Sequence, residues 1–372
     1  MTKQTWLNQR LEKFERLRPY VVGQSVNELA RSLGRHVSEI VKLDSNENFL
    51  YPKEILASIL CQLSNSLDPR QYPTDEKDEL IEALSKYVNV SPQQIVVGNG
   101  SDELIELVAR NFLRGNEEAI TVYPTFVMYR IIMNSLGNNL IEVPLDSKFR
   151  FNSSSMLKAC TERTVLCFLC SPNNPTGNQF PREEIRAFAE DFKGIVLLDE
   201  AYVEFAQYSL TDLVETLDNL IVVRTFSKAF GLAGMRIGYL VASARIASCL
   251  RRVQLPYNLN VMSLAMARAV LNRPEVMLST VQAVKKERSW LSEALSSLLN
   301  VIVYPSDANF ILFRTSEPSK NVARDLRARG VLIRSFDDSQ GLEGCLRVTV
   351  GTRKMNVSFL EALEDVLQSR RR

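Results

Sequence analysis

The stretch TFSKAFGLAGMRIGY, residues 225–239, follows the apolar run LIVV at 220–223. It sets hydroxyl, amine and guanidinium side chains around two glycines, and the residues concerned are Thr225, Ser227, Lys228, Arg236, Gly231 and Gly234. Such residues after a strand form either an ordinary solvated loop or a site that binds a phosphate and places an amine beside it. The residues that follow the other strands decide between these two interpretations.

The composition of the 372-residue chain argues against several broad classes of function. Lys and Arg number 45 against 43 Asp and Glu, a formal net charge of +2, so nothing favours nucleic acid or an anionic membrane as a partner. No apolar run approaches the roughly 20 residues that cross a bilayer, and residues 1–20 are too charged for the apolar core of a signal peptide. We expect a soluble, cytoplasmic protein with no nucleic-acid or membrane partner.

The cysteines and the single histidine argue against metal and hydrolase sites. Cys167 and Cys170 have the spacing of metal ligands, but they lie in an expected buried strand, where side chains alternate between the two faces. The chain has no second pair of this kind, so we expect no metal site. His36 lies in the helix-like segment ARSLGRHVSEI (30–40) and is expected on the surface. The catalytic base is therefore expected to be a residue other than histidine.

Short apolar runs alternate with longer amphipathic ones between residues 94 and 243. This alternation predicts an α/β fold with a mostly parallel sheet that helices cover on both faces. Helices are expected at 102–113 and 182–192. The expected strands are 94–99, 118–123, 140–145, 164–170, 195–202, 219–226 and 237–243.

The pattern changes after residue 260. One long helical stretch, 261–299, contains Pro274 as an expected break. Three strands are expected next, VIVYPSDANFILFR (301–314), VLIRSF (331–336) and CLRVTVG (345–351), and a helix at 357–367. We expect residues 51–258 to form a large domain, residues 259–372 a smaller one, and residues 1–50 an N-terminal arm that joins the smaller domain.

Polar residues follow two of the expected strands in the positions where ligands bind, outside the carboxyl ends of an open α/β sheet. GNGSDE (98–103) places Gly100, Ser101 and Asp102 at the start of a helix, whose free N–H groups attract anions. SPNNPTG (171–177) holds Asn174 in a loop that two prolines and a glycine restrict. Rigid polar loops at a strand end favour a binding site.

Further strand ends add an aromatic ring and a carboxylate. Phe126, in PTFVMY, can lie flat against a ring, although an ordinary core position fits it equally well. Asp199 follows four apolar residues towards the end of the expected buried strand 195–202, and Tyr202 follows three positions later. An unpaired buried carboxylate is costly, so Asp199 requires a partner, and a cationic group on a ligand would supply one.

Together the strand ends offer a group of residues that can bind a phosphate, and also a lysine, a carboxylate, an aromatic ring, a phenol and a carboxamide. Pyridoxal 5′-phosphate requires this set. Its aldehyde needs an amine, and its ring nitrogen needs an anion. Its O3′ oxygen needs hydrogen-bond donors, and its phosphate group needs hydroxyl groups, N–H groups and a cation. The sequence therefore predicts that Lys228 anchors this cofactor and that the neighbours of Lys228 hold the phosphate.

Two arginines follow in the second half of the chain. Arg347 lies inside the apolar strand CLRVTV and Arg334 inside VLIRSF. Either could point to solvent, but an amino-acid substrate brings a carboxylate that a planar guanidinium binds with two parallel hydrogen bonds. An arginine within an apolar strand, such as Arg347, favours a site residue.

Nearly the whole chain resembles the fold-type I pyridoxal-phosphate aminotransferases of class I/II, and among them the histidinol-phosphate aminotransferase family. The stretch around Lys228 and SPNNPTG are typical of the superfamily, and the former together with PYNLN narrows the resemblance. The matching segments, in the family's order, are LRPYVVG, KLDSNEN, RQYP, GNGSDE, YPTFVMY, SPNNPTG, LLDEAYVEF, RTFSKAFGLAGMRIGY, PYNLN and CLRVTVGTR.

The resemblance implies roles for individual residues. Lys228 would be the Schiff-base lysine and proton carrier, Asp199 would pair with the ring nitrogen, and Asn174 and Tyr202 would face O3′. Phe126 would stack on the ring, where several family members have tyrosine. Tyr72 would reach the cofactor phosphate of the neighbouring subunit, and Arg347 would bind the substrate α-carboxyl group. Tyr20 and Arg334 would meet a distal substrate phosphate. The residues implied around the cofactor phosphate are Gly100, Ser101, Asp102, Thr225, Ser227 and Arg236.

The implied reaction transfers an amino group between histidinol phosphate and 2-oxoglutarate in histidine biosynthesis, in a homodimer with shared sites. Relatives with similar motifs act on aromatic amino acids or decarboxylate threonine phosphate, and the latter also need an arginine for a phosphate. A regulator that binds the cofactor without catalysis is an alternative of another class. Such proteins carry an added DNA-binding module, and the segment before Asp44 is too short to be one.

Overall fold

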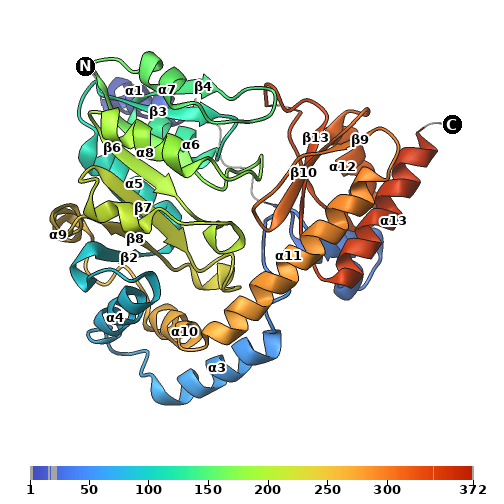
Figure 1. Ribbon diagram of the computed structural model, residues 1–372. Coiled ribbons are helices and arrows are strands. Elements are labelled where there is room, and N and C mark those ends of the chain that lie inside the picture. Colours follow the sequence, from blue (N-terminus) through green and yellow to red (C-terminus); the bar gives the residue numbers. More distant parts are fainter. Residues whose placement is uncertain (1–2, 16, 18–22, 338, 371–372) are drawn as a thin grey trace.

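The computed structural model describes residues 3–15, 17, 23–337 and 339–370 (Figure 1). Its large sheet has seven strands in the order β2-β8-β7-β6-β5-β3-β4, and β8 alone runs antiparallel to its neighbours. All seven strands predicted from the sequence are confirmed, as is the mostly parallel sheet. Their bounds are β2 Ile95–Gly98, β3 Glu118–Tyr123, β4 Asn139–Pro144, β5 Thr164–Cys170, β6 Ile195–Asp199, β7 Leu220–Thr225 and β8 Gly238–Ala242.

The central strands are buried on both faces, which explains their continuous apolar runs. Every residue of β7 and β8 is buried, and strands covered on both sides read as unbroken apolar segments. Helices α5 and α9 pack on each other and on this sheet, and α7 packs on α8 and on β3 and β4. The bounds are α5 Gly100–Phe112, α6 Met128–Leu136, α7 Ser153–Ala159, α8 Arg182–Asp191 and α9 Ala244–Val253.

The second half forms a smaller antiparallel sheet, in the order β12-β13-β10-β9. In Figure 1 this sheet lies beside α12 and α13, and the long helix α11 runs from it towards the large sheet. The largest cluster of buried apolar side chains includes residues of both sheets. The bounds are β9 Val301–Val303, β10 Phe310–Thr315, β12 Arg334–Ser335, β13 Cys345–Thr349, α11 Pro274–Ser296, α12 Ser319–Ala328 and α13 Arg353–Ser369.

Two of the expected strands of the smaller sheet are each divided. The segment 301–314 was predicted as one strand, but it forms the hairpin β9–β10. Between these strands the backbone leaves the sheet, because the Asp307 N–H donates to the carbonyl oxygen of Gly177 at 2.7 Å. The segment 331–336 is divided at Ile333, since β11 (Val331–Leu332) pairs with β1 (Val41–Lys42) whereas β12 pairs with β13.

The pairing of β1 with β11 attaches the expected N-terminal arm to the second half of the chain, and the grouping of the two as one domain stays a prediction. Pro274 breaks the predicted long helix, since α10 ends at Leu271 and Pro274 is the first residue of α11, where its missing N–H costs nothing. Helix α10 packs against α3 and α4, so the exact division at residue 259 stays a prediction. The remaining helices are α1 Lys3–Glu15, α2 Val26–Leu33, α3 Lys53–Ser66, α4 Glu76–Val88 and α10 Val261–Leu271.

His36 is exposed as expected, but it does not lie in a helix. Helix α2 ends at Leu33 because Gly34 adopts a left-handed conformation with φ 62°. His36 instead caps the short 3₁₀ turn Val37–Glu39. Among the described helices, none has the length and apolar character needed to span a bilayer.

Three glycines after β7 have different roles. Gly231 has φ +66°, a conformation that residues with a side chain adopt at a cost, so it permits the turn after Lys228. Gly238 lies on β8, where a Cβ atom would be 2.7 Å from the Ser101 nitrogen and 2.8 Å from the Gly100 carbonyl carbon. Nothing lies within 4 Å of the corresponding position at Gly234. Close backbone approach therefore requires glycine at 238 and leaves 234 unconstrained.

Gly238→Ala is expected to destabilise the protein by about 1–3 kcal/mol, because the backbone atoms it meets cannot move aside as a flexible side chain would. The matched control is Gly234→Ala in the same loop, which should change the free energy of unfolding by no more than about 0.5 kcal/mol. Urea denaturation of both variants checks this. Equal losses in the two variants would contradict the steric argument.

Candidate active site

A cavity of about 470 Å³ lies at the carboxyl ends of β3, β5, β6 and β7 and reaches β12 and β13 of the smaller sheet. Most of the site residues predicted from the sequence lie on its wall, although they come from distant parts of the chain. These are Ser101, Asp102, Phe126, Asn174, Asp199, Tyr202, Thr225, Ser227, Lys228, Arg236, Arg334 and Arg347.

Lys228 places a primary amine in this cavity. Its Nζ donates to the backbone oxygen of Ser45 at 3.1 Å and lies 5.7 Å from the centre of the Tyr202 ring. Burial, together with the positive charge of Arg347, lowers the pKa of Lys228 to about 8. An amine with this pKa is partly neutral near pH 7 to 8, and the neutral form is a nucleophile and a proton acceptor.

Asp199 is 2% exposed at the end of β6. Its Oδ2 accepts a hydrogen bond from the hydroxyl of Tyr129 at 3.0 Å, and its Oδ1 accepts one from the Ala201 N–H at 3.0 Å. Burial nevertheless raises the pKa of Asp199 to about 7, against the two hydrogen bonds, which lower it. A cation beside this carboxylate would return it to the charged form.

Tyr202, Asn174 and Arg347 form a hydrogen-bonded chain that joins the two sheets. The hydroxyl of Tyr202 accepts from Nδ2 of Asn174 at 3.4 Å and from Nδ2 of Asn46 at 3.0 Å. Oδ1 of Asn174 accepts from Nη1 of Arg347 at 2.6 Å, and Nη2 of Arg347 donates to the backbone oxygen of Asp44 at 2.8 Å. The chain fixes a phenol, an amide and a guanidinium on one wall of the cavity.

A second wall provides donors for an anion. The Ser227 N–H donates to Oγ1 of Thr225 at 3.1 Å, and the same Oγ1 lies 3.0 Å from Oγ of Ser227. Arg236 has φ 49° and directs Nη2 to Asp102 at 3.1 Å, with almost half of its side chain exposed. These residues face the first turn of α5, whose N–H groups lack helical partners.

Gly100 does not line the cavity, but it allows Arg236 to approach the start of α5. It has φ +81°, and a Cβ there would lie 2.8 Å from Nη2 of Arg236. The absence of side chains at Gly100 and at Gly238, which lies close to Ser101, leaves space at the N-terminus of α5. The hydroxyls of Thr225 and Ser227 and the guanidinium of Arg236 can therefore converge there. A phosphate matches this donor set.

Arg334 and Arg347 are register partners on the antiparallel strands β12 and β13, and both line the cavity. Tyr72 lies outside the cavity that its own chain forms: it is 73% exposed and stacks on Tyr257 with ring centres 4.5 Å apart. Tyr20 lies outside the described residues.

Two residues that contact this site were not assigned a role from the sequence. Tyr129 is fully buried and stacks on Phe168 with ring centres 4.9 Å apart, and its hydroxyl reaches Asp199. Asn46 is 1% exposed, has φ 55° and also accepts from Asn309 through its backbone oxygen at 3.0 Å. The segments YPTFVMY and KLDSNEN contain them, but neither segment indicates which side chain turns inward.

Cys167 and Cys170 are buried free thiols of β5, three positions apart and therefore on opposite faces of a covered strand. No group of three or more His, Cys, Asp and Glu residues within the described chain has the arrangement of a metal site.

Comparisons with known proteins place the chain in a family. Residues 38–363 match the family described as aminotransferase class I and II. A histidinol-phosphate aminotransferase from Caldanaerobacter subterraneus subsp. tengcongensis is 38% identical over 328 residues, which cover 88% of this chain and 93% of the relative. The chain therefore belongs to the class I and II aminotransferases, as the resemblance implied, and is a pyridoxal-phosphate-dependent enzyme.

Solved structures confirm the fold-type I architecture. A histidinol-phosphate aminotransferase from Sinorhizobium meliloti in complex with pyridoxal-5′-phosphate superposes with a TM-score of 0.86 at 24% identity, covering 96% of this chain and 97% of the other. An L-threonine-O-3-phosphate decarboxylase from Porphyromonas gingivalis gives a TM-score of 0.78 at 26% identity, covering 88% and 100% of the two chains.

The donor set of the cavity fits pyridoxal 5′-phosphate. The buried carboxylate of Asp199 requires a cationic partner, and the amine of Lys228 has a lowered pKa suited to reaction with an aldehyde. The hydroxyls beside the α5 N-terminus suit a phosphate.

In the cofactor-free protein, stability should fall as the pH rises from about 4 to about 7, because folded Asp199 keeps its proton up to a pKa of about 7 whereas the unfolded chain loses it near 3.8. Asp199→Asn removes this titration. The variant should therefore gain stability relative to the wild type across that window, and urea denaturation at several pH values measures the difference.

Tyr129→Phe is the companion variant in the same measurement. It deletes a hydrogen bond that favours the charged form of Asp199, so the pKa of Asp199 should rise by about 0.5–1 unit. The pH range over which stability falls should then extend to higher pH. If the wild-type and Asp199→Asn curves run parallel between pH 4 and 7, Asp199 does not titrate in that range.

Proposed function

We propose that this aminotransferase moves an amino group between L-histidinol phosphate and 2-oxoglutarate, by way of 3-(imidazol-4-yl)-2-oxopropyl phosphate and glutamate, in histidine biosynthesis. The observation that carries the proposal is the pairing of Arg334 and Arg347 on adjacent strands of one cavity wall. Two guanidinium groups suit substrates with anionic groups at separate ends. The name of the relative from Caldanaerobacter supports the same substrate. A cytoplasmic location stays a prediction.

The proposed cofactor-binding roles are supported by the positions of the residues concerned, all of which lie on the cavity wall except Gly100. Lys228 would bind the aldehyde carbon, Asp199 the protonated ring nitrogen, Tyr202 and Asn174 the O3′ oxygen, and Phe126 a ring face. The phosphate would be held by Gly100, Ser101, Asp102, Thr225, Ser227 and Arg236. When bound, pyridoxal 5′-phosphate supplies an aldehyde that accepts the amino group and a protonated ring that withdraws electrons from the reacting carbon.

The protein groups control where protons reside. Lys228 moves the proton of the reacting carbon, because its pKa of about 8 allows the amine to accept and return a proton near neutral pH. Asp199 keeps the ring nitrogen protonated, because a buried carboxylate is stabilised by an adjacent positive charge. Tyr202 stays protonated, since burial raises its pKa above the usual range, so its hydroxyl donates a hydrogen bond.

Arg347 would bind the carboxylate of glutamate or 2-oxoglutarate. In the described structure Nη1 and Nη2 of this arginine contact Asn174 and the Asp44 backbone oxygen, which hold the guanidinium plane in place. Arg334 would bind the phosphate of histidinol phosphate, which lacks that carboxylate. Tyr20 is predicted to contact the same phosphate.

One further candidate activity has a specific basis, the similarity in fold to the threonine-phosphate decarboxylase from Porphyromonas gingivalis. A phosphorylated donor would use Arg334 in both reactions, so that residue does not separate them. An aromatic amino-acid aminotransferase would make no use of a phosphate-binding arginine. A non-catalytic regulator would bind the cofactor without turnover.

We expect Arg334→Met to lower kcat/KM for histidinol phosphate about 10- to 100-fold, the value of one charge-assisted hydrogen bond, and to spare phenylalanine. Arg347→Met, the matched variant, should reduce kcat/KM most for glutamate. The assay supplies each donor with the appropriate oxo acid and follows amino transfer and carbon dioxide together.

The outcomes separate the candidates. Equal losses for phosphorylated and unphosphorylated donors in Arg334→Met would favour an aromatic aminotransferase. Release of carbon dioxide from threonine phosphate, without transfer from histidinol phosphate, would favour the decarboxylase. Cofactor binding without turnover of any donor would favour the regulator.

We also propose a homodimer in which Tyr72 reaches the cofactor phosphate of the neighbouring subunit. The exposed ring of Tyr72 lies outside its own cavity and stacks on Tyr257, and Leu255, two residues before Tyr257 in the chain, is 69% exposed. Exposed apolar side chains grouped in this way favour a protein interface.

Mixing Tyr72→Glu with Lys228→Ala tests whether the sites are shared. Each variant alone should be inactive, since one places a carboxylate at the neighbour's phosphate and the other lacks the amine. After subunit exchange, half of the dimers combine both chains and carry one intact site, so roughly a quarter of all sites should be active. No recovery after verified exchange would show that each site lies within one chain.

A further inference from the structure

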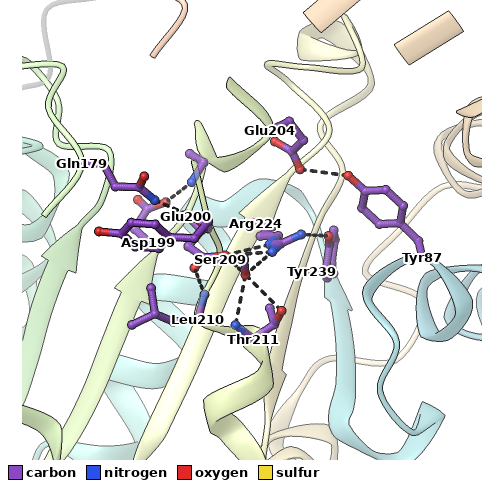
Figure 2. A network of polar contacts seen from close by, with 12 residues as sticks. Tyr87, Gln179, Asp199, Glu200, Glu204, Ser209, Leu210, Thr211, Arg224 and Tyr239 are labelled. Atoms are coloured by element: carbon purple, nitrogen blue, oxygen red, sulfur yellow. Dashed lines mark hydrogen bonds and ion pairs between the residues drawn. The ribbon is translucent and has the colours of Figure 1, made fainter. Parts of the chain in front are cut away.

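A buried ion pair lies behind the cofactor site. Arg224 on β7 contacts Glu200, the residue that follows β6, with Nη2 2.9 Å and Nε 3.0 Å from the same carboxylate oxygen. The two side chains are 7% and 1% exposed. Figure 2 shows both side chains within a network of polar contacts.

Neighbouring groups fix the geometry of this pair. The hydroxyl of Ser209 donates to Oε2 of Glu200 at 2.8 Å and accepts from Nη2 of Arg224. The Leu210 N–H donates to Oε1 of Glu200 at 2.7 Å, and Nη1 of Arg224 donates to the Tyr239 hydroxyl at 3.4 Å (Figure 2). Both charged groups therefore have several partners, so neither side chain can move without losing more than one contact.

Each member of the pair is the chain neighbour of a residue in the proposed cofactor site. Asp199 precedes Glu200 and Thr225 follows Arg224, and only Asp199 and Thr225 line the cavity among these four described residues. The backbone joins the two strand ends as well, because the Glu200 N–H donates to the Val223 carbonyl oxygen at 2.8 Å.

We propose that Glu200 and Arg224 are positioning residues for pyridoxal 5′-phosphate, which hold the ends of β6 and β7 at the separation that Asp199 and Thr225 require. The inference rests on the cofactor-binding roles proposed above. The ion pair contacts no substrate, so it acts through the backbone of the two strand ends. A displaced Asp199 or Thr225 would lose contacts to the ring nitrogen or the phosphate, and small displacements of this kind are costly to a bound group.

Cofactor affinity tests the proposal without reference to any substrate. Apoenzyme of the wild type and of Glu200→Gln is titrated with pyridoxal 5′-phosphate, and the visible absorbance gives the dissociation constant. We expect Glu200→Gln to weaken binding about 10-fold or more, as loss of a supporting contact behind a bound group does. Tyr239→Phe keeps the ring and removes only one contact to Arg224, so a smaller weakening of about 2- to 5-fold is expected.

The matched control is Glu118→Gln. Glu118 is also a buried carboxylate, with 4% of its side chain exposed, and pairs with Arg163, but it lies at the first residue of β3, at the opposite end of the strand from the cavity. Its variant should lose stability in urea while its cofactor dissociation constant stays within about 2-fold of the wild type, because nothing near the site changes.

Three results would be informative. Wild-type cofactor affinity in both Glu200→Gln and Tyr239→Phe would overturn the proposal, whatever their stability; if Glu200→Gln fails to fold, Tyr239→Phe alone decides. Equal weakening in Glu118→Gln would also overturn it, since the effect would then be general destabilisation. An Asp199→Asn apoenzyme with wild-type affinity would instead overturn the proposed cofactor-binding role of Asp199.

Discussion

The burial of one carboxylate constrains the rest of this site. Asp199 ends a strand of apolar residues with almost no exposure, and two hydrogen bonds replace only part of the hydration that it loses. The pKa of Asp199 therefore rises to about 7, while the pKa of Lys228 in the same cavity falls to about 8. Desolvation shifts an acid and a base towards each other, so small changes in nearby charge decide which of them is ionised.

The second constraint is that the site joins distant parts of the chain. Arg347 extends from the smaller sheet to Asn174 and to the Asp44 backbone, and Asn46 contacts both Tyr202 and Thr349. The N-terminal arm thus forms part of the cavity wall between the two sheets. A substrate carboxylate that binds Arg347 would affect the contact of Arg347 with Asn174, which joins the two sheets. Recognition of the carboxylate is thereby linked to the position of one sheet relative to the other.

The sequence predicted the large sheet well because all its strands except the edge strand β4 are largely buried, and unbroken apolar runs such as TVLCFLC are unambiguous. It predicted the smaller sheet less well. Residues 301–314 are mostly apolar, and the bond from Asp307 to Gly177, which removes the middle of that segment from the sheet, depends on tertiary contact. Most polar residues of the candidate site could be predicted, since they follow strand ends. Tyr129 could not, because a tyrosine at the start of an apolar helix is typical of a core.

The alternation of side chains along a strand explains why functional and supporting residues occur as adjacent pairs. Asp199 and Thr225 face the cavity, so Glu200 and Arg224 must face away from it, and there they meet each other. A shift of one of these strands by one residue would turn its own member of the ion pair into the cavity and its own cavity residue away from it. Because a buried charge without its partner is costly, the pair also opposes such a shift. The same two segments therefore carry both the proposed ligands and the contacts that fix their register.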